Sequence, residues 1–541
     1  MTRGPLVLFG VAALVGLPLI VVALSLLNPN WDILNHLWQT VIPEYISHSL
    51  ILLVSVGFGV TILGVSTAWC VSQYDFPGWR WVSWGLLLPL AMPAYISAYT
   101  YTGLLDYAGP VQQALRDTFD LNIGEYWFPS IRSIEGAIFV LSLVLYPYVY
   151  LITRAAFMQQ STAAFESART LGAGPIRSFF RIALPLARPA IATGVTLALM
   201  ETLADYGTME YFGVTVFTTG IFRTWYGMGD AQGALQLASI LLLFVIVLIL
   251  IERYSRRQAK FYQRRSQNNN FRKPLRGKAA WLASAVCWLP IVLGFAIPAS
   301  QLLMWSIERA DTWTQASFWT LTLNTLWLGL LAATITVALA LWLAYGRRRH
   351  PTRAIRTAIT TAGLGYAIPG IVIAVGILIP LAWLDHRIID FSKSLFGVNP
   401  GLLLSGTVVA LVFAYTVRFL SISLQTISSG LEQITPQMDD SARTLGASSR
   451  RIMTRIHLPL LKSSILAALI LVLVDVMKEL PATLVLRPFN FNTLAVKAFE
   501  MASDERLADA GPPALMIVLV GLIPVLMLSR ALRTQTIKTG D

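Results

Sequence analysis

Two pairs of carboxylates lie inside long apolar stretches of this chain, at matching positions in its two halves. Glu201 and Asp205 are four residues apart, and Asp475 and Glu479 repeat that spacing 274 residues later. A spacing of four predicts that each pair shares one face of a helix. Carboxylates within a membrane are costly, so they usually face a pathway or a partner. Four such groups suit a hard cation, and Tyr206 could add a phenolate oxygen, so we expect these residues to line a translocation path.

A purely structural role for these acids stays open. Lys478 lies within the second pair, where it could neutralise one carboxylate. Cys70 and Cys287 show no metal-binding or disulfide spacing. The histidines are scattered over predicted loops, at His36, His48, His350, His386 and His457. The sequence therefore assigns no firm metal site. It also predicts no catalytic residue, because no nucleophile and base are spaced for one.

The elements that must hold these residues are membrane-spanning helices. Of the 541 residues, 55% are hydrophobic and only 13% are charged. Apolar runs long enough to cross a bilayer recur about twelve times. We therefore expect an all-α polytopic membrane protein with about twelve transmembrane helices.

The charge pattern indicates an orientation rather than a nucleic-acid partner. The net charge is +13, but basic loops in a membrane protein fix its orientation. Residues 253–278 carry ten Lys or Arg and no acid, and residues 347–356 carry five Arg. Residues 28–48 carry neither Lys nor Arg. The alternation predicts that both termini are cytoplasmic, with Pro5–Leu27 kept as a span rather than a signal peptide. Contact of 253–278 with lipid headgroups is a second interpretation.

The heptapeptide SARTLGA occurs twice, at 167–173 and at 441–447. The identity extends further, since residues 167–186 match residues 441–460 at 13 of 20 positions. The strongest identity thus lies in charged stretches between apolar runs, which favours a functional loop over a duplication kept only for packing.

The repeat predicts a tandem architecture. Residues 1–252 form a first half of six spans, 253–278 a basic cytoplasmic linker, and 279–541 a second half of six spans. Because six is even and the copied loop is basic in both halves, the halves keep one orientation. This is a parallel repeat about an axis along the membrane normal, as some transporters have.

The repeated loops predict a turn followed by an amphipathic helix. In the first copy, Gly172 permits a sharp turn and Pro175 suits a helix start. In the restarted helix, Arg177 and Arg181 lie on a different face from the apolar residues. Such a helix could lie on lipid. Two identical loops more readily dock two identical cytoplasmic partners, and we expect them at about residues 160–188 and 434–462.

These loops resemble the signature Glu-Ala-Ala-x3-Gly-x9-Ile-x-Leu-Pro of the permease subunits of binding-protein-dependent ABC importers. The spacing is kept in both copies; Ser replaces the first Ala in both, and Asp replaces Glu in the second. The first copy comprises Glu166, Ser167, Ala168, Gly172, Ile182, Leu184 and Pro185. The second comprises Asp440, Ser441, Ala442, Gly446, Ile456, Leu458 and Pro459. The resemblance covers nearly the whole chain and implies two type I permease halves.

The resemblance implies that each loop is a coupling helix seated on an ATPase subunit. The chain has no G-x4-G-K-[ST] phosphate loop. ATP and Mg²⁺ would therefore be bound by two separate ATPase subunits, and this chain would be a transport subunit with no cofactor of its own. The resemblance also implies a bacterial inner membrane location and a periplasmic binding protein as a further partner.

Three segments are similar to the fused two-half permeases of bacterial ferric-iron importers: 86–110, 201–208 and 475–495. The resemblance implies alternating access for ferric iron delivered by the binding protein. Thiamine, a phosphonate or a polyamine is an alternative substrate for the same role. A secondary transporter driven by an ion gradient would use the same acids, but it would leave the two loops unexplained.

Overall fold

The computed structural model describes residues 3–27, 29–122, 125–160, 170, 172, 174–257 and 272–537, and most of these are helical. Within these ranges ten helices are long and apolar enough to cross a membrane, or twelve if each of two bent helix pairs is one span. One pair, Trp79–Ala91 with Ala94–Phe119, bends by 94°; the other, Arg450–Leu460 with Lys462–Lys478, bends by 69°. The predicted all-α class with about twelve spans is confirmed.

The helices form two compact units that do not follow the two halves of the sequence. Unit 1 comprises Met1–Asn35, Ile221–Leu242 and Gln315–Lys497. Unit 2 comprises His36–Gly220, Leu243–Thr314 and Ala498–Asp541. The first helix of each half therefore belongs to the unit that holds most of the other half. The predicted boundaries at residues 252 and 278 describe the sequence repeat and stay a prediction for the folded domains.

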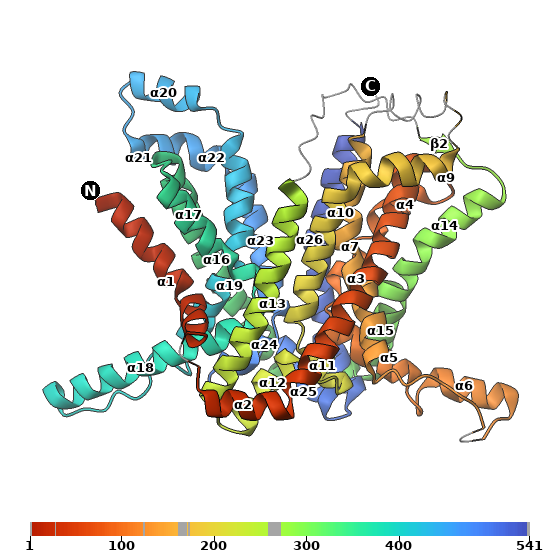
Figure 1. Ribbon diagram of the computed structural model, residues 1–541, viewed down its shortest axis with the longest axis horizontal. Coiled ribbons are helices and arrows are strands. Elements are labelled where there is room, and N and C mark those ends of the chain that lie inside the picture. The colour runs from red at the N-terminus through yellow and green to blue at the C-terminus, as the bar shows by residue number, and fades with distance from the viewer. Residues whose placement is uncertain are drawn as a thin grey trace. The chain divides into compact units, whose positions relative to one another are not determined.

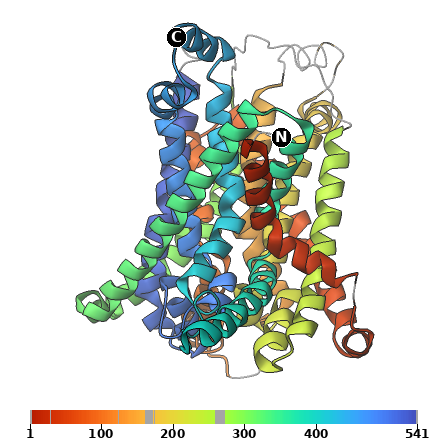
Figure 2. The ribbon, with the colours of Figure 1, turned by 90° about the vertical axis from the view of Figure 1, so that its left-hand side faces the viewer.

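Unit 1 is built around three long helices that pack against one another, α16 (Ala316–Arg349), α19 (Val408–Glu432) and α23 (Lys462–Lys478). Helix α1 (Arg3–Ser25) lies against α17 (Arg353–Ala362) and α18 (Gly370–Phe396) (Figure 2). The remaining helices wholly within unit 1 are α20 (Pro436–Thr444), α21 (Ser449–Ile452), α22 (Leu458–Leu460) and α24 (Pro481–Leu486).

Unit 2 is centred on α3 (Ile42–Gln73) and α7 (Ile134–Met158), which run side by side (Figure 1). Glycine allows their close approach, because a Cβ on Gly64 would lie 2.6 Å from the Cβ of Val149. The other helices wholly within this unit are α4 (Trp79–Gly85), α5 (Ala94–Leu105), α6 (Pro110–Phe119), α9 (Pro175–Ser178), α10 (Leu184–Ala204), α11 (Gly207–Phe212), α14 (Lys278–Ile291), α15 (Ile297–Glu308) and α26 (Leu507–Ile537).

Four helices contribute residues to both units: α2 (Trp31–Thr40), α12 (Phe217–Phe222), α13 (Ala231–Arg257) and α25 (Leu494–Ser503). The only strands in the described ranges are β1 (Tyr74–Asp75) and β2 (Lys273–Pro274), which pair in parallel. This pairing fastens the end of the predicted linker to the loop that follows α3.

Both halves restart a helix at a matching proline. In one half the 3-10 turn Leu88–Ala91 precedes Pro93, whose extended backbone leads into α5. In the other, the 3-10 turn Gly363–Ala367 precedes Pro369, which leads into α18 in the same way. Proline lacks a backbone N–H and suits the start of a helix, so the sequences at 91–93 (Ala-Met-Pro) and 367–369 (Ala-Ile-Pro) produce the same break.

Helix α18 is fastened to the loop that follows it by Asp385. This buried carboxylate accepts hydrogen bonds from the backbone N–H groups of Leu403, Leu404 and Ser405 at 3.0, 2.9 and 2.7 Å. A buried carboxylate is stable only when its oxygens have such donors. Asp385 therefore fixes the path of the loop between α18 and α19.

Candidate functional site

The second predicted coupling segment is a helix, a glycine turn and a second helix. At the end of α20, the N–H of Ala447 donates to Ala442 O and the N–H of Gly446 donates to Arg443 O, both at 2.9 Å. This pair of bonds is the Schellman motif, which requires a left-handed residue. Gly446 supplies it with φ of +80°, while a Cβ there would meet nothing within 4 Å. The glycine is thus needed for its backbone conformation and not for space.

Helix α20 lies at one end of the unit 1 helices (Figure 1) and presents several of the signature residues to solvent. Asp440 and Ser441 are exposed, whereas Ala442 is buried. Leu445, in the turn, is 87% exposed.

The first predicted coupling segment is only partly described, since Glu166, Ser167 and Ala168 lie outside the described residues. Gly172 has φ of +78°, close to the value of its counterpart in the second copy. Further along, a π-helical turn at Phe179–Ala183 matches one at Met453–His457, 274 residues later.

The signature residues after the turns also occupy matching places. Ile182 and Ile456 lie within the two π-helical turns, and both are half-buried. Leu184 and Leu458 are half-buried as well, and the prolines that follow them, Pro185 and Pro459, are exposed. The local geometry of the repeat is therefore the same in both copies from the π turn to the Leu-Pro step. Beyond it α10 continues as one helix, whereas the second copy bends by 69° between Leu460 and Lys462. The docking role of both segments stays a prediction.

The two segments are anchored by different chemistry. In unit 2 the ring of Trp69 lies 5.2 Å from that of Phe157 and 5.0 Å from that of Phe179. Nearby, Gln160 donates from Nε2 to the carbonyl of Ala183 at 2.9 Å. The first segment is thus held by aromatic packing and one amide.

In unit 1 the corresponding anchor is ionic. Asp439 of α20 lies 3.0 Å from Nη2 of Arg348 and 2.7 Å from Nε2 of His457. Arg348 also donates to the carbonyls of Leu431 and Ile434 at 2.8 and 3.0 Å. Burial alone would raise the pKa of Asp439, but the hydrogen bond from His457 and the charge of Arg348 outweigh burial and lower it. The second segment is therefore held by a carboxylate that stays ionised.

The acids of the first pair do not share a helix face. Helix α10 ends at Ala204, and Asp205 follows in an extended conformation. Its carboxylate accepts hydrogen bonds from the N–H groups of Thr208 and Met209, at 2.9 and 3.3 Å. Asp205 therefore caps the start of α11. The expected arrangement was wrong because the helix ends one residue earlier than its apolar pattern suggests.

The second pair departs from the prediction in the same way. Helix α23 ends at Lys478, and Glu479 caps α24 by accepting from the N–H of Ala482 at 3.2 Å. Glu479 also forms a buried ion pair with Arg418 of α19, with Nε 3.1 Å from Oε2. Sequence reasoning missed Arg418, although a basic residue inside an apolar run is a signal for an intramembrane partner.

The remaining acids differ in their surroundings. Glu201 lies half-buried one turn before the end of α10, rather than midway along it, and neither it nor Asp205 forms an ion pair with any described residue. Asp475 is half-buried on α23, three residues from Lys478. The pair in unit 2 thus has no basic partner among the described residues, whereas the pair in unit 1 has basic residues beside it. A pathway role for either pair stays a prediction.

The structure also bears on Tyr206 and on metal binding. Tyr206 is only 2% exposed, and its ring lies 6.1 Å from that of Phe499. In the part of the chain that the structure describes, no three side chains of His, Cys, Asp or Glu are grouped to hold a metal ion.

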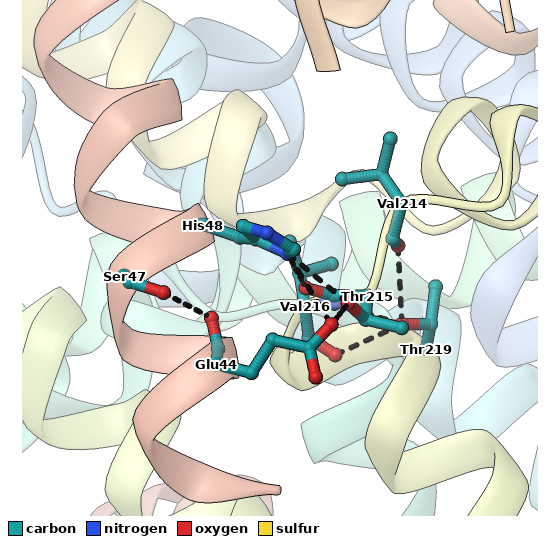
Figure 3. A network of polar contacts seen from close by, with 7 residues as sticks. All are labelled: Glu44, Ser47, His48, Val214, Thr215, Val216 and Thr219. Atoms are coloured by element: carbon teal, nitrogen blue, oxygen red, sulfur yellow. Dashed lines mark hydrogen bonds and ion pairs between the residues drawn. The ribbon is translucent and has the colours of Figure 1, made fainter. Parts of the chain in front are cut away.

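The loop that follows α11 is tied to the start of α3 (Figure 3). Nδ1 of His48 lies 2.8 Å from the carbonyl oxygen of Thr215, and the hydroxyl of Thr215 donates to Glu44. Within the loop, the N–H of Val216 donates to the hydroxyl of Thr219 at 3.0 Å. His48 therefore has a structural partner, and the network fixes the loop between α11 and α12.

Comparison with known families decides what this architecture is. Residues 5–260 and 336–534 match the family described as "Binding-protein-dependent transport system inner membrane component". The chain belongs to this family. It is thus a multi-pass membrane component of a transport system, and both halves of the repeat carry the family's sequence.

Individual relatives cover the chain to different extents. It is 25% identical over 540 residues to the "Fe(3+)-transport system permease protein FbpB 2" of Haemophilus influenzae, covering 98% of this chain and 99% of that one. The "Ferric transport system permease protein FbpB" of Actinobacillus pleuropneumoniae is 24% identical over 504 residues, covering 88% and 68%. The "Molybdenum transport system permease protein ModB" of Escherichia coli is 28% identical over 223 residues, which is 40% of this chain and 92% of ModB.

Proposed function

We propose that this chain is the translocation subunit of an ATP-driven importer for ferric iron. The substrate assignment rests on one two-half relative that is named for Fe(3+) transport. The chain is similar to it over the whole length, since 99% of that relative is covered. ModB, named for molybdenum transport, matches only 40% of this chain, so its similarity supports the shared permease architecture. The fused two-half arrangement is common to this chain and the iron-named relatives.

Two ATPase subunits would supply the energy, one at each coupling segment. The segments repeat a left-handed glycine and a π-helical turn at the same offset, so they suit two copies of one partner. Closure of the ATPase pair would move α20 and its counterpart. The motion would reach α23 and α10 through the Leu-Pro steps at 458–459 and 184–185.

The coupling segments define the cytoplasmic face, on which both termini would lie. A periplasmic binding protein would deliver the cation to the opposite face. Alternating access would then expose the path first outward and then inward. The carboxylates of Glu201 and Asp205 supply oxygen ligands that are not neutralised by a basic residue within the described ranges.

The same acids argue against an oxyanion as substrate. An anion such as molybdate would approach Glu201 and Asp205 without a compensating cation among the described residues, and like charges repel strongly in a low dielectric. Thiamine or a polyamine carries positive charge and is not excluded by this argument, and a phosphonate is disfavoured with the oxyanions.

Reconstitution tests the proposal. The chain is purified with its ATPase subunits, placed in proteoliposomes, and given ferric iron on its binding protein with ATP inside or outside. We expect uptake of radiolabelled ferric iron that needs hydrolysable ATP and is insensitive to molybdate. Uptake driven by a proton or sodium gradient without ATP would refute the ABC role. ATP-dependent uptake of another substrate, with none of iron, would refute the substrate alone.

A further inference from the structure

A cavity of about 510 Å³ lies in unit 1 where α16, α17 and α19 end or begin, next to the second coupling segment. Its charged and polar lining consists of Arg347, Arg348, Arg356, Ser428 and Glu432, and Pro436 closes it at the start of α20. A volume of this size falls within the range of ligand sites, about 300–1,000 Å³. The function proposed above makes no use of it.

The hydroxyl of Ser428 is the first sign of a missing ligand. Ser428 is 8% exposed, and its Oγ has no hydrogen-bond partner. Serine and threonine in helices commonly bond to the carbonyl four residues earlier, as Thr426 does to Ile422 at 2.8 Å on the same helix. A buried hydroxyl that does not form this bond needs another hydrogen-bond partner, and Ser428 is one of the residues that line the cavity.

The charges of the cavity are the second sign. Arg348 is occupied by Asp439 and two carbonyls, as described above. Arg347 and Arg356 form no ion pair with any residue in the described ranges, although Glu432 shares the lining. Arg347, which is half-buried, and Arg356, which is exposed, therefore line one space from two different helices, with Glu432 as the acid in the same lining.

Orientation signals and helix dipoles account for part of this arrangement. Basic residues at the cytoplasmic ends of spans fix topology, and Arg347 in the last turn of α16 interacts favourably with the helix dipole. Neither effect requires two arginines from different helices to line one cavity. Neither effect leaves a buried hydroxyl without a partner.

We propose that this cavity binds a phosphate group. Guanidinium groups pair with phosphate oxygens through paired N–H donors, and a hydroxyl donor such as Ser428 Oγ completes such a site. The phosphate could belong to an anionic phospholipid of the adjacent leaflet or to a soluble phosphate ester. The guanidinium and hydroxyl donors would bind the phosphate group in the same way in both cases, and the experiment below distinguishes the two sources.

The position of the cavity would connect its occupancy to the coupling segment. Arg348 lines the cavity and also holds Asp439 of α20. Leu431 and Ile434, whose carbonyls accept from Arg348, line the cavity too. A phosphate held by Arg347 and Arg356 would stiffen this same wall and so would bias the position of α20.

The test uses the full chain purified in detergent and in nanodiscs, with two probes. Native mass spectrometry measures retention of phosphatidylglycerol against phosphatidylcholine, and a thermal shift assay measures binding of inorganic phosphate. The test variant is Arg347→Gln with Arg356→Gln. The matched control is Arg349→Gln with Arg353→Gln, which removes the same charge from exposed neighbours outside the cavity lining.

We expect the test variant to weaken binding of one probe by about tenfold or more, as loss of hydrogen bonds to charged groups does. The control should change binding by less than about twofold. Loss of phosphatidylglycerol alone assigns a lipid headgroup, and loss of inorganic phosphate alone assigns a soluble ester. Equal loss in both variants would reveal general surface attraction and overturn the site.

A milder variant keeps the test decisive if the double arginine variant does not fold. Ser428→Ala removes one hydroxyl and no charge, and it fits the helix. We expect this variant to weaken the same probe by about threefold to tenfold. Binding of both probes at the wild-type level in Ser428→Ala, or no binding of either probe by the wild type, would overturn the proposal.

Discussion

Replacing Glu479 by Gln should destabilise the protein, because it removes the carboxylate that pairs with the buried guanidinium of Arg418. The two side chains are 5% and 9% exposed, and Nε lies 3.1 Å from Oε2. At this distance two unit charges attract by about 5 kcal/mol at an effective dielectric constant of about 20. Removing one partner of a buried pair costs about 3–5 kcal/mol. Arg418 keeps its hydrogen bond to Ile368 at 3.3 Å, so we expect about 3 kcal/mol.

The assay is a double-mutant cycle read by membrane abundance and thermal unfolding in detergent. Glu479→Gln and Arg418→Met should each lower both readouts, and the double variant should recover most of the loss because no lone charge remains. Asp205→Asn is the matched control, since it alters a capping acid without an ion pair and should cost about 1 kcal/mol. If Glu479→Gln kept wild-type stability and lost only uptake, the acid would serve the substrate and the structural reasoning would be refuted.

Three other variants and one pH titration test separate parts of the structure. Gly446→Val, at φ of +80°, should cost about 1–2 kcal/mol and reduce co-purification of the ATPase while membrane abundance stays unchanged. Glu201→Gln with Asp475→Asn should abolish ferric-iron uptake without loss of ATPase binding. Burial opposes ionisation of Asp439, but its two basic partners lower its pKa below the ordinary value. Its stabilisation is therefore present above about pH 4 and lost as the pH falls through the lower pKa, which hydrogen exchange in α20 can measure. Asp385→Asn should increase proteolytic cleavage in the loop before α19.

Each of these has a control within the chain. Gly174→Ala has open space and no left-handed backbone, so weakened ATPase binding there would show that strain is not the cause. Partial rescue of the double acid variant by Lys478→Gln would favour a structural pairing over a pathway. Asp439→Asn should lack the acid transition, and a transition that persists would assign it to another group. Asp390 is exposed on α18, and Asp390→Asn should leave proteolysis unchanged.

The parts of the fold that could be predicted from the sequence are those set by local chemistry. The glycine turn at Gly446 follows from a helix pattern interrupted by a residue that tolerates positive φ. The break at Pro369 follows from the missing N–H of proline. Both features depend on a few neighbouring residues, which the repeat presents twice.

The parts of the site that could not be predicted from the sequence depend on contacts between distant residues. The partner of Glu479 is Arg418, which lies 61 residues earlier on another helix. Nothing in the spacing of either residue indicates which helices meet. The wrong prediction that Asp205 shares a helix face with Glu201 has a different cause. An apolar pattern does not show that α10 ends at Ala204.

The packing of α1 has a consequence for how the protein is made. Helix α1 ends at Ser25, but the helices against which it packs, α17 and α18, begin at Arg353 and Gly370, so roughly 330 residues or more separate α1 from them in order of synthesis. At a translation rate of about 5–20 residues per second, α1 waits on the order of 20–70 s in the bilayer before its partner emerges. During that interval its interface must be covered by lipid or by the insertion machinery. The packing of α1 in unit 1 is therefore completed only when translation of the second half supplies α17 and α18.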